Sequence, residues 1–336
     1  MPEINYEIDF VIPWVDDTEQ SWQRERAKYQ QTEDEDGESV RFRDWDNLKY
    51  WFRGVEKYAP WVRTVHLITW GHLPDWINEY HPKLHIVKHQ DYIPKRFLPT
   101  FNSHTIELNM HRIEGLAEHF VYFNDDMFLI RPLRKQDFFR NGKPCDMLAF
   151  QPTVANPDNP IMSHVFLNNI LVLSKYMNKR DNVRKQPGNY FKIGYPPLYF
   201  FYNLLELAFP RYTGLYTVHG PSSFCKKTFV DMWNREEELL SATCSHRFRN
   251  KQDVNQYLMR EWQKLNGEFH AKNVTRDYAY FNIKSKNDRL LQILNKQSKK
   301  VICINDSDEK IDFVKVKTEI NGAMEHILPE KSAFER

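Results

Sequence analysis

The sequence lacks several features that would point to particular classes of protein. Its four cysteines form no CxxC pair and no spacing typical of a metal site, and they lie at Cys145, Cys225, Cys244 and Cys303. Lys and Arg number 47 against 45 for Asp and Glu, so the net charge of +2 gives no general attraction to nucleic acid or an anionic membrane. No internal repeat or low-complexity segment is present. We therefore expect reduced thiols, no nucleic-acid partner, and an anion site that is local.

Long hydrophobic runs are also missing. No window reaches the roughly 18 apolar residues of a membrane span, and acidic residues precede the first apolar run, the reverse of a secretory signal. This pattern predicts a cytoplasmic protein. A peripheral contact with the inner face of the plasma membrane stays open, because a polysaccharide acceptor is often lipid-linked.

What the sequence does contain is an alternation of apolar runs and helical patterns. Residues 8–15, 62–71 and 81–90 are predicted as strands, and residues 46–58 as a helix that Pro60 ends. Residues 105–118 are predicted as a helix that leads into a strand at 120–123. Strands separated by helices indicate an α/β fold with a mostly parallel central sheet flanked by helices.

The second half of the chain is less regular. Residues 195–209 are predicted as a buried aromatic helix, residues 252–263 as another helix, and the acidic stretch 32–39 as a solvated loop. The tail from residue 296 is predicted to contain a strand. We expect a single catalytic domain over residues 1–295 and a C-terminal extension over 296–336.

Acidic residues follow the strand at 120–123. Asn124, Asp125 and Asp126 come where the carboxyl ends of parallel strands bind ligands, and the two carboxylates could hold a divalent metal or act as a base. Asn and Asp also favour turns, so a purely structural turn is the alternative.

Other candidates for chemistry are single residues at the ends of elements. Glu107 and His111 share a helix face at i, i+4, although a surface pair would look the same. His219 is predicted at a strand end before a Gly-Pro turn, where it could act as a base or be a structural histidine. Arg247 and Arg249 alternate ahead of Asp253, and they could bind phosphate or lie on a basic surface strand. Together, an acid, a histidine and an arginine are the groups that phosphoryl transfer requires.

Four blocks of this sequence, in order, resemble the Stealth family. They are IDFVIPWVDDTE at residues 8–19, the long stretch from RFRDWDNLKYWF to HRIEGLAEHFVYFNDDMFL at residues 41–129, TVHGPSSF around His219, and SHRFRNKQDVNQ around Arg249. That family includes bacterial capsular polysaccharide phosphotransferases and the catalytic part of the animal lysosomal-enzyme N-acetylglucosamine-1-phosphotransferase. The inserted recognition modules of the animal enzyme are absent here, so a glycan acceptor is expected.

The resemblance implies roles for particular residues on a nucleotide-sugar-transferase core of the GT-A-like kind. The implied catalytic residues are Glu107, Asp126, His219 and Arg249. We assign substrate binding, by this resemblance and by chemistry, to Asp9, Trp14, Arg41, Asn124, Arg247 and Asp253. Mg²⁺ or Mn²⁺ is expected at Asp125 and Asp126.

The implied reaction is attack of a glycan hydroxyl on the β-phosphorus of a UDP-sugar, which releases UMP and forms a phosphodiester in capsular or exopolysaccharide synthesis. The acceptor would be a glycan or a lipid-linked oligosaccharide. The nearest alternative is a metal-dependent glycosyltransferase, which would release UDP. A carbohydrate-binding protein without activity is a further alternative, for which the aromatic content of 15% is the only support.

Overall fold

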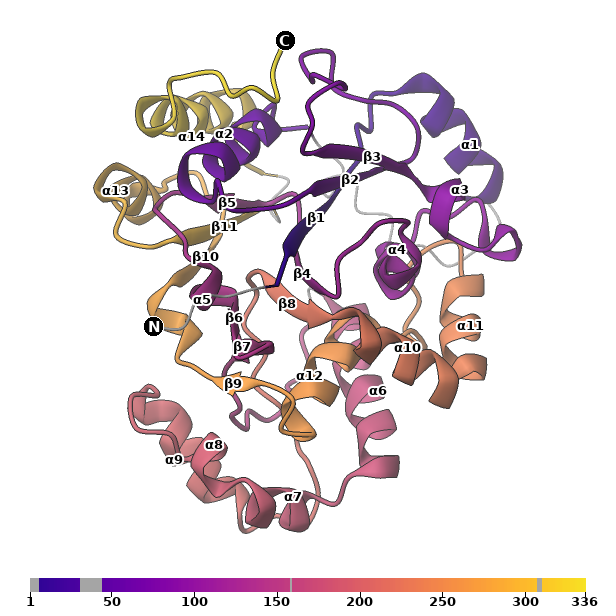
Figure 1. Cartoon of the computed structure of the whole chain (residues 1–336), viewed down its shortest axis with the longest axis vertical. Helices are drawn as coiled ribbons and strands as arrows, with labels where there is room; N and C mark the ends of the chain where they lie inside the picture. The colour runs from indigo at the N-terminus through magenta and orange to yellow at the C-terminus, as the bar shows by residue number, and fades with distance from the viewer. Residues whose placement is uncertain (1–5, 31–43, 158, 307–309) are drawn as a thin grey trace.

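A five-stranded sheet forms the centre of the computed structural model, which describes residues 6–30, 44–157, 159–306 and 310–336 (Figure 1). Its strand order is β3 (Leu84–Lys88), β2 (Val65–Thr69), β1 (Ile8–Trp14), β4 (His119–Tyr122) and β8 (Ser222–Cys225). The first four strands are parallel and β8 is antiparallel. The predicted α/β fold with a mostly parallel sheet is confirmed, whereas its GT-A-like character stays a prediction.

Strand β1 lies in the middle of this sheet because its residues are apolar on both faces. Phe10 pairs with Val65 on one side and with Val121 on the other, and all three side chains are fully buried. Helix α2 (Leu48–Tyr58) covers this region, and its Trp51 packs on Phe10 with ring centroids 6.3 Å apart. The helix predicted at 46–58 is thus confirmed.

The predicted helix at 105–118 is only partly correct. Helix α4 spans Ser103–Leu108 and is followed by a 3₁₀ turn at Met110–Arg112. The side chain of Asn109 donates to the carbonyl of Thr105, and Gly115 has a φ of +70°, a left-handed conformation that ends helical geometry. The chain can therefore turn sharply into β4.

Two smaller sheets complete the fold. One consists of β10 (Tyr278–Asn282), β11 (Val301–Asn305) and β5 (Met127–Leu129), and the other of β6 (Phe139–Arg140), β7 (Lys143–Asp146) and β9 (His270–Ala271). Within the segment 296–336, β11 pairs with β5, which directly follows the predicted acidic turn. Helix α14 (Phe313–Ile327) and the residues after it also join the main core, where Phe334 packs on Phe52.

The remaining helices surround these sheets. They are α1 (Gln20–Gln30), α3 (His89–Tyr92), α5 (Lys135–Phe138), α6 (Pro160–Tyr176), α7 (Lys179–Lys185), α8 (Pro187–Tyr190), α9 (Pro197–Glu206), α10 (Lys226–Arg235), α11 (Glu237–Ser245), α12 (Tyr257–Leu265) and α13 (Asp288–Lys296). Helices α7, α8 and α9 lie at the bottom of Figure 1, away from the central sheet. The helix predicted at 195–209 exists as α9, but it is not buried, because five of its apolar side chains are about half exposed.

Three further expectations can be compared with the structure. The four cysteines are free and buried. The predicted loop at 32–39 lies outside the described residues. Among the helices in the described parts of the chain, none combines the length and the apolar character that crossing a membrane requires.

Candidate active site

The acidic turn between β4 and β5 holds Asp126 at the junction of two sheets. Its carbonyl oxygen accepts a hydrogen bond of 2.8 Å from the backbone N–H of Ile304, which extends the pairing of β11 with β5. The turn is therefore fixed from both sides, by the central sheet through β4 and by the smaller sheet through β11.

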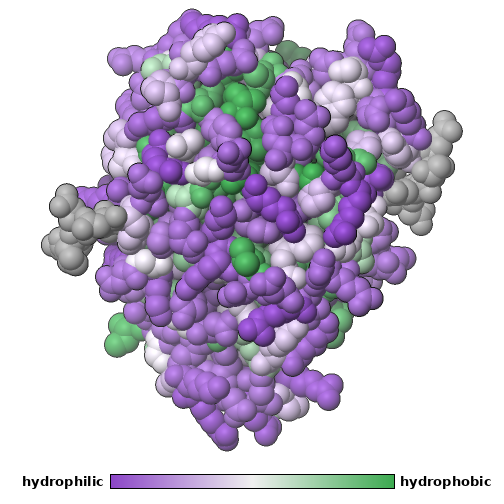
Figure 2. All heavy atoms as spheres, turned by 45° about the vertical axis from the view of Figure 1, so that its right-hand side comes forward, coloured by the Kyte–Doolittle hydropathy of each residue, from purple (hydrophilic) through white to green (hydrophobic). Residues whose placement is uncertain are grey.

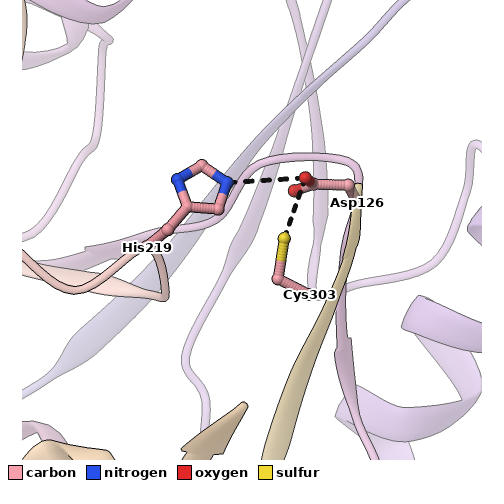
Figure 3. A group of neighbouring side chains, drawn as sticks. All are labelled: Asp126, His219 and Cys303. Carbon is pink, nitrogen blue, oxygen red and sulfur yellow. Dashed lines mark hydrogen bonds and ion pairs between the residues drawn. The ribbon is translucent and has the colours of Figure 1, made fainter. Parts of the chain in front are cut away.

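Two side chains, those of His219 and Cys303, meet the carboxylate of Asp126 (Figure 3). Nε2 of His219 lies 3.5 Å from Oδ2 of Asp126, and the thiol of Cys303 donates to the same oxygen at 2.9 Å. The hydroxyl of Tyr257 lies 3.1 Å from Nδ1 of His219 and fixes the other side of the imidazole ring. His219 is about one-third exposed, so a ligand can reach it while its ring is held.

The ionisation of this cluster follows from its contacts. Burial raises the pKa of Asp126, but the hydrogen bonds and charge of His219 and the thiol of Cys303 together outweigh it, and the net pKa is lowered. Burial, and then the charge of Asp126, hold the pKa of Cys303 well above its usual value. Near neutral pH, Asp126 is thus an anion and Cys303 a protonated thiol that donates to it.

Helix α4 connects Glu107 with Arg249. Ser103, at the start of α4, accepts hydrogen bonds from Nε and Nη2 of Arg249 at 3.0 and 2.8 Å. Glu107 is buried at the end of the same helix, where it accepts from the hydroxyl of Tyr122 at 3.3 Å and from the backbone N–H of Gln256 at 3.4 Å. Burial raises the pKa of Glu107, and the positive charges of His104 and Arg249 oppose this shift.

The predicted metal ligands offer carboxylate oxygens to a cation. Oδ1 of Asp126 is buried and has no hydrogen-bond partner among the described residues, which is the kind of atom that an ion or a water would satisfy. Asp125 has an exposed side chain. Desolvation of its carboxyl by the surrounding protein, and then the charge of Asp126, nevertheless raise its pKa. These oxygens fit Mg²⁺ or Mn²⁺. The neighbouring imidazole and thiol do not suit Mg²⁺.

Asp9 lies in the central sheet, away from the acidic turn. It is completely buried near the amino end of β1. The acidic turn lies at the opposite edge of the sheet, after the carboxyl end of the parallel strand β4. Its carboxylate accepts from Arg63, from His66 and from the backbone N–H of Ala117. Asp9 therefore ties β1 to its neighbours, and its role in substrate binding stays a prediction.

Asp253 is likewise surrounded by donors of the protein. It lies in the turn before α12 rather than on a helix, is completely buried, and accepts hydrogen bonds from Asn102, His104, His246 and the backbone N–H of Asn250. Burial raises its pKa, but these donors lower it to about 2 overall. Both carboxylate oxygens accept from donors of the protein, so Asp253 holds the loop that carries Arg249. Its role in substrate binding stays a prediction.

The other predicted residues have different positions. Arg247 donates to the carbonyl of Pro99 at 2.9 Å, which is a contact within the protein. Trp14 lies at the carboxyl end of β1, half-buried against His72, and Asn124 is half-buried in the acidic turn. Arg41 lies outside the described residues.

Two local expectations about the histidines were wrong. His219 precedes strand β8 instead of following a strand, since residues 214–218 form only an isolated bridge between Leu215 and Phe150. His111 does not pair with Glu107, because α4 has ended and its ring packs against Phe229 and Trp233. Burial lowers the pKa of His111 to about 3.

Sequence reasoning missed Cys303 and the two tyrosines of the site, Tyr122 and Tyr257. The sequence carried no signal for them, because Cys303 is one residue of an apolar strand and each tyrosine meets its partner through the tertiary fold.

Comparison with known proteins shows the family of the chain. Residues 41–146 match the family model described as Stealth protein CR2, conserved region 2. A Capsular polysaccharide phosphotransferase WcwK of Streptococcus pneumoniae is 36% identical over 331 residues, which cover 98% of this chain and 99% of the relative. The chain belongs to the Stealth family.

Other similarities extend this result. An Exopolysaccharide phosphotransferase cps2G of Lactiplantibacillus plantarum is 36% identical over 98% of this chain and 97% of its own length. These relatives identify this member of the Stealth family as a phosphotransferase. Among solved structures, the WbbM bifunctional glycosyltransferase has a TM-score of 0.37 and 11% identity, covering 98% of this chain and 53% of that one.

Proposed function

We propose that this Stealth protein transfers hexose-1-phosphate, and specifically N-acetylhexosamine-1-phosphate, from a UDP-sugar to a glycan hydroxyl. The products would be a phosphodiester between two sugars and UMP, in the synthesis of a capsular or exopolysaccharide. The observation that carries this proposal is the meeting of Asp126 with His219, two residues that the family resemblance assigns to catalysis.

His219 is the better candidate for the base that takes the proton of the acceptor hydroxyl. It is partly exposed, whereas Glu107 is buried. If Nδ1–H of His219 donates to the hydroxyl of Tyr257, Nε2 keeps its lone pair and faces the site. After Nε2 takes the proton, the imidazolium would donate to the Asp126 carboxylate, which stabilises the charged ring.

Arg249 and Glu107 would serve the donor side of the site. A guanidinium binds two phosphate oxygens at once, and Arg249 is held in place by its two hydrogen bonds to Ser103. Glu107 would hold α4, and with it Ser103, through Tyr122 and the start of α12. In this arrangement Arg249 neutralises the charge that develops on the diphosphate as UMP leaves.

A divalent cation, Mg²⁺ or Mn²⁺, would be held by Asp126 with Asp125. When bound, it would supply positive charge against the pyrophosphate of the donor. The acceptor is proposed to be a glycan hydroxyl. If the glycan is lipid-linked, the protein would work at the cytoplasmic, inner face of the plasma membrane.

The test is to identify the nucleotide that is released. Purified protein is incubated with UDP-N-acetylglucosamine and other UDP-hexoses, Mg²⁺ and a short glycan acceptor, and the products are separated by chromatography. UMP together with a new phosphodiester signal in phosphorus NMR would support the proposal. UDP would instead indicate a glycosyltransferase, and no turnover with any donor would favour a carbohydrate-binding protein. A matched His219→Gln variant should lose about 100-fold or more in rate.

A further inference from the structure

Helix α9 (Pro197–Glu206) has the reverse of the polarity expected for a surface helix in water. A helix on a soluble protein normally turns its apolar side chains inward and its polar ones outward. In α9 the residues turned inward include Asn203 and Glu206, which are 0% and 3% exposed. The exposed ones are apolar and between 47% and 55% accessible, namely Leu198, Phe200, Phe201, Leu204 and Leu205.

The inward polar residues explain why this orientation is stable. Asn203 accepts from the backbone N–H of Phe150 at 2.7 Å and donates to the carbonyl of Tyr190 at 2.6 Å. Glu206 forms a buried ion pair of 2.7 Å with Lys179 of α7. Rotating α9 to hide its leucines would break these bonds and leave a buried charge unpaired, which is strongly unfavourable. The apolar face is thus locked outward.

The apolar surface extends beyond α9 itself. Leu207 and Phe209 follow the helix and are 44% and 51% exposed, and Ile193 precedes it with a fully exposed side chain. Exposed apolar patches of this kind mark contact with a partner or a membrane. Figure 2 shows hydrophilic residues over most of the lower part of one face, so this end of the molecule presents both kinds of surface.

The charges next to this apolar surface are mainly positive. We call residues 178–211, which include α7, α8 and α9, the lower arm; it contains six basic and two acidic residues in a chain whose net charge is only +2. One basic residue, Lys179, is neutralised inside by Glu206. The basic residues with exposed side chains are Arg180, Arg184, Lys185 and Arg211, against one exposed acid, Asp181. Anionic phospholipid headgroups attract such a cluster.

We propose that the lower arm docks on an anionic phospholipid surface, with the apolar side chains of α9 inserted at the boundary between headgroups and acyl chains. A short helix with leucine and phenylalanine on its outer face and lysine or arginine beside it is suited to lie in that interface. This docking rests on the proposed function, because it would bring the enzyme to a lipid-linked acceptor. Vesicle binding is measured without any substrate, so its outcome is independent of the transfer reaction.

The lower arm also connects with the candidate active site. It is continuous with α6, where Phe166 stacks on the ring of Tyr257 with centroids 5.7 Å apart and an interplanar angle of 12°. Tyr257 in turn contacts His219. Binding of α9 to a membrane would therefore anchor the same continuous segment that positions His219, the proposed base.

The experiment is flotation of the full chain with vesicles of phosphatidylcholine alone or with phosphatidylglycerol added. We expect binding to the anionic vesicles, at least about tenfold stronger than to the neutral ones. The double variant Phe201→Ser and Leu204→Ser should reduce this binding at least about tenfold, because both inserted side chains are lost. Lys185→Gln and Arg211→Gln should reduce it about fivefold each at low salt, and much less at high salt.

The matched control is Val314→Ser, since Val314 on α14 is 73% exposed but lies on a different helix from the lower arm. It should bind vesicles like the wild type, and circular dichroism should show that every variant is folded. Failure of the wild type to bind anionic vesicles would overturn the proposal. So would sedimentation showing a dimer that the α9 variants convert to monomer without any vesicle binding, because α9 would then be an interface between two copies.

Discussion

The thiol of Cys303 donates to the Asp126 carboxylate at 2.9 Å, although the two residues lie 177 positions apart in the sequence. Hydrogen bonds to a charged group contribute about 1.5–3 kcal/mol. We expect Cys303→Ala to lower turnover about tenfold with the fold retained, because Asp126 loses a donor. Cys303→Ser keeps a donor and should stay within about threefold of the wild type. Initial rates of both variants test this, and equal rates for Ala and wild type would contradict it.

Zinc should inhibit the enzyme through the same cluster. The ligand atoms of Asp126, His219 and Cys303 lie within 4.8 Å of one another, and this set of oxygen, nitrogen and sulfur suits Zn²⁺. We expect added Zn²⁺ to lower the rate measured in Mg²⁺, and a chelator followed by fresh Mg²⁺ to restore it. Cys303→Ala should be roughly tenfold less sensitive, since one of three ligands is gone. Equal sensitivity of the variant would place zinc elsewhere.

Arg249 and Arg247 form a natural pair for comparison, because they lie on one loop and differ in what they contact. Arg249→Lys keeps the charge but loses the planar fork that binds two oxygens, so we expect turnover to fall about 100-fold. Arg247→Lys can still donate to the carbonyl of Pro99 and should remain within about threefold. Steady-state kinetics of the two variants, with thermal melting as the control for folding, make the test. Equal losses would contradict the separate roles.

Asp253→Asn should destabilise the fold by about 2–4 kcal/mol at neutral pH, because two histidines lose a buried anionic acceptor. The pKa of Asp253 in the folded protein, about 2, lies below its ordinary value of 3.8. Its ionisation therefore stabilises the fold above about pH 4, and this contribution disappears as the pH falls towards 2.

Urea unfolding at several pH values tests this prediction for Asp253. The difference between wild type and Asp253→Asn should be largest at neutral pH and should shrink below pH 4. Asp181→Asn is a suitable control, since Asp181 is exposed in an i, i+3 pair with Arg184 and should change stability by under about 0.5 kcal/mol. A pH-independent difference for Asp253→Asn would show that its carboxylate is not the source of the stability.

The central sheet could be predicted because each strand is a continuous apolar run, such as residues 8–14, that ends at a polar turn. The orientation of α9 in the lower arm could not be predicted in this way. The apolar pattern at 195–209 predicts a buried helix, but the orientation of α9 is decided by the partners of Asn203 and Glu206, which come from other segments. Local periodicity is therefore insufficient where buried polar groups set the packing.

In the candidate site, too, the local sequence identifies residues but tertiary contacts decide their environment. Glu107, Asp126, His219 and Arg249 were found through family blocks, and the structure brings Asp126 and His219 into contact. Asp9 and Asp253 also lie in family blocks and carry carboxylates like Asp126, yet both are buried among their own hydrogen-bond donors. An acidic side chain in a motif can thus serve the fold or the reaction, and only its place relative to the strand ends and its donors distinguishes the two.

Strand β11 sets the order in which the site can form during synthesis. Asp126 is made early, but its neighbours Cys303 and Ile304 belong to a strand that leaves the ribosome much later. A growing chain that has already formed the central sheet would still have an incomplete reaction centre until residues 301–305 emerge. Nascent or truncated chains that stop before residue 301 would lack both of these contacts to Asp126.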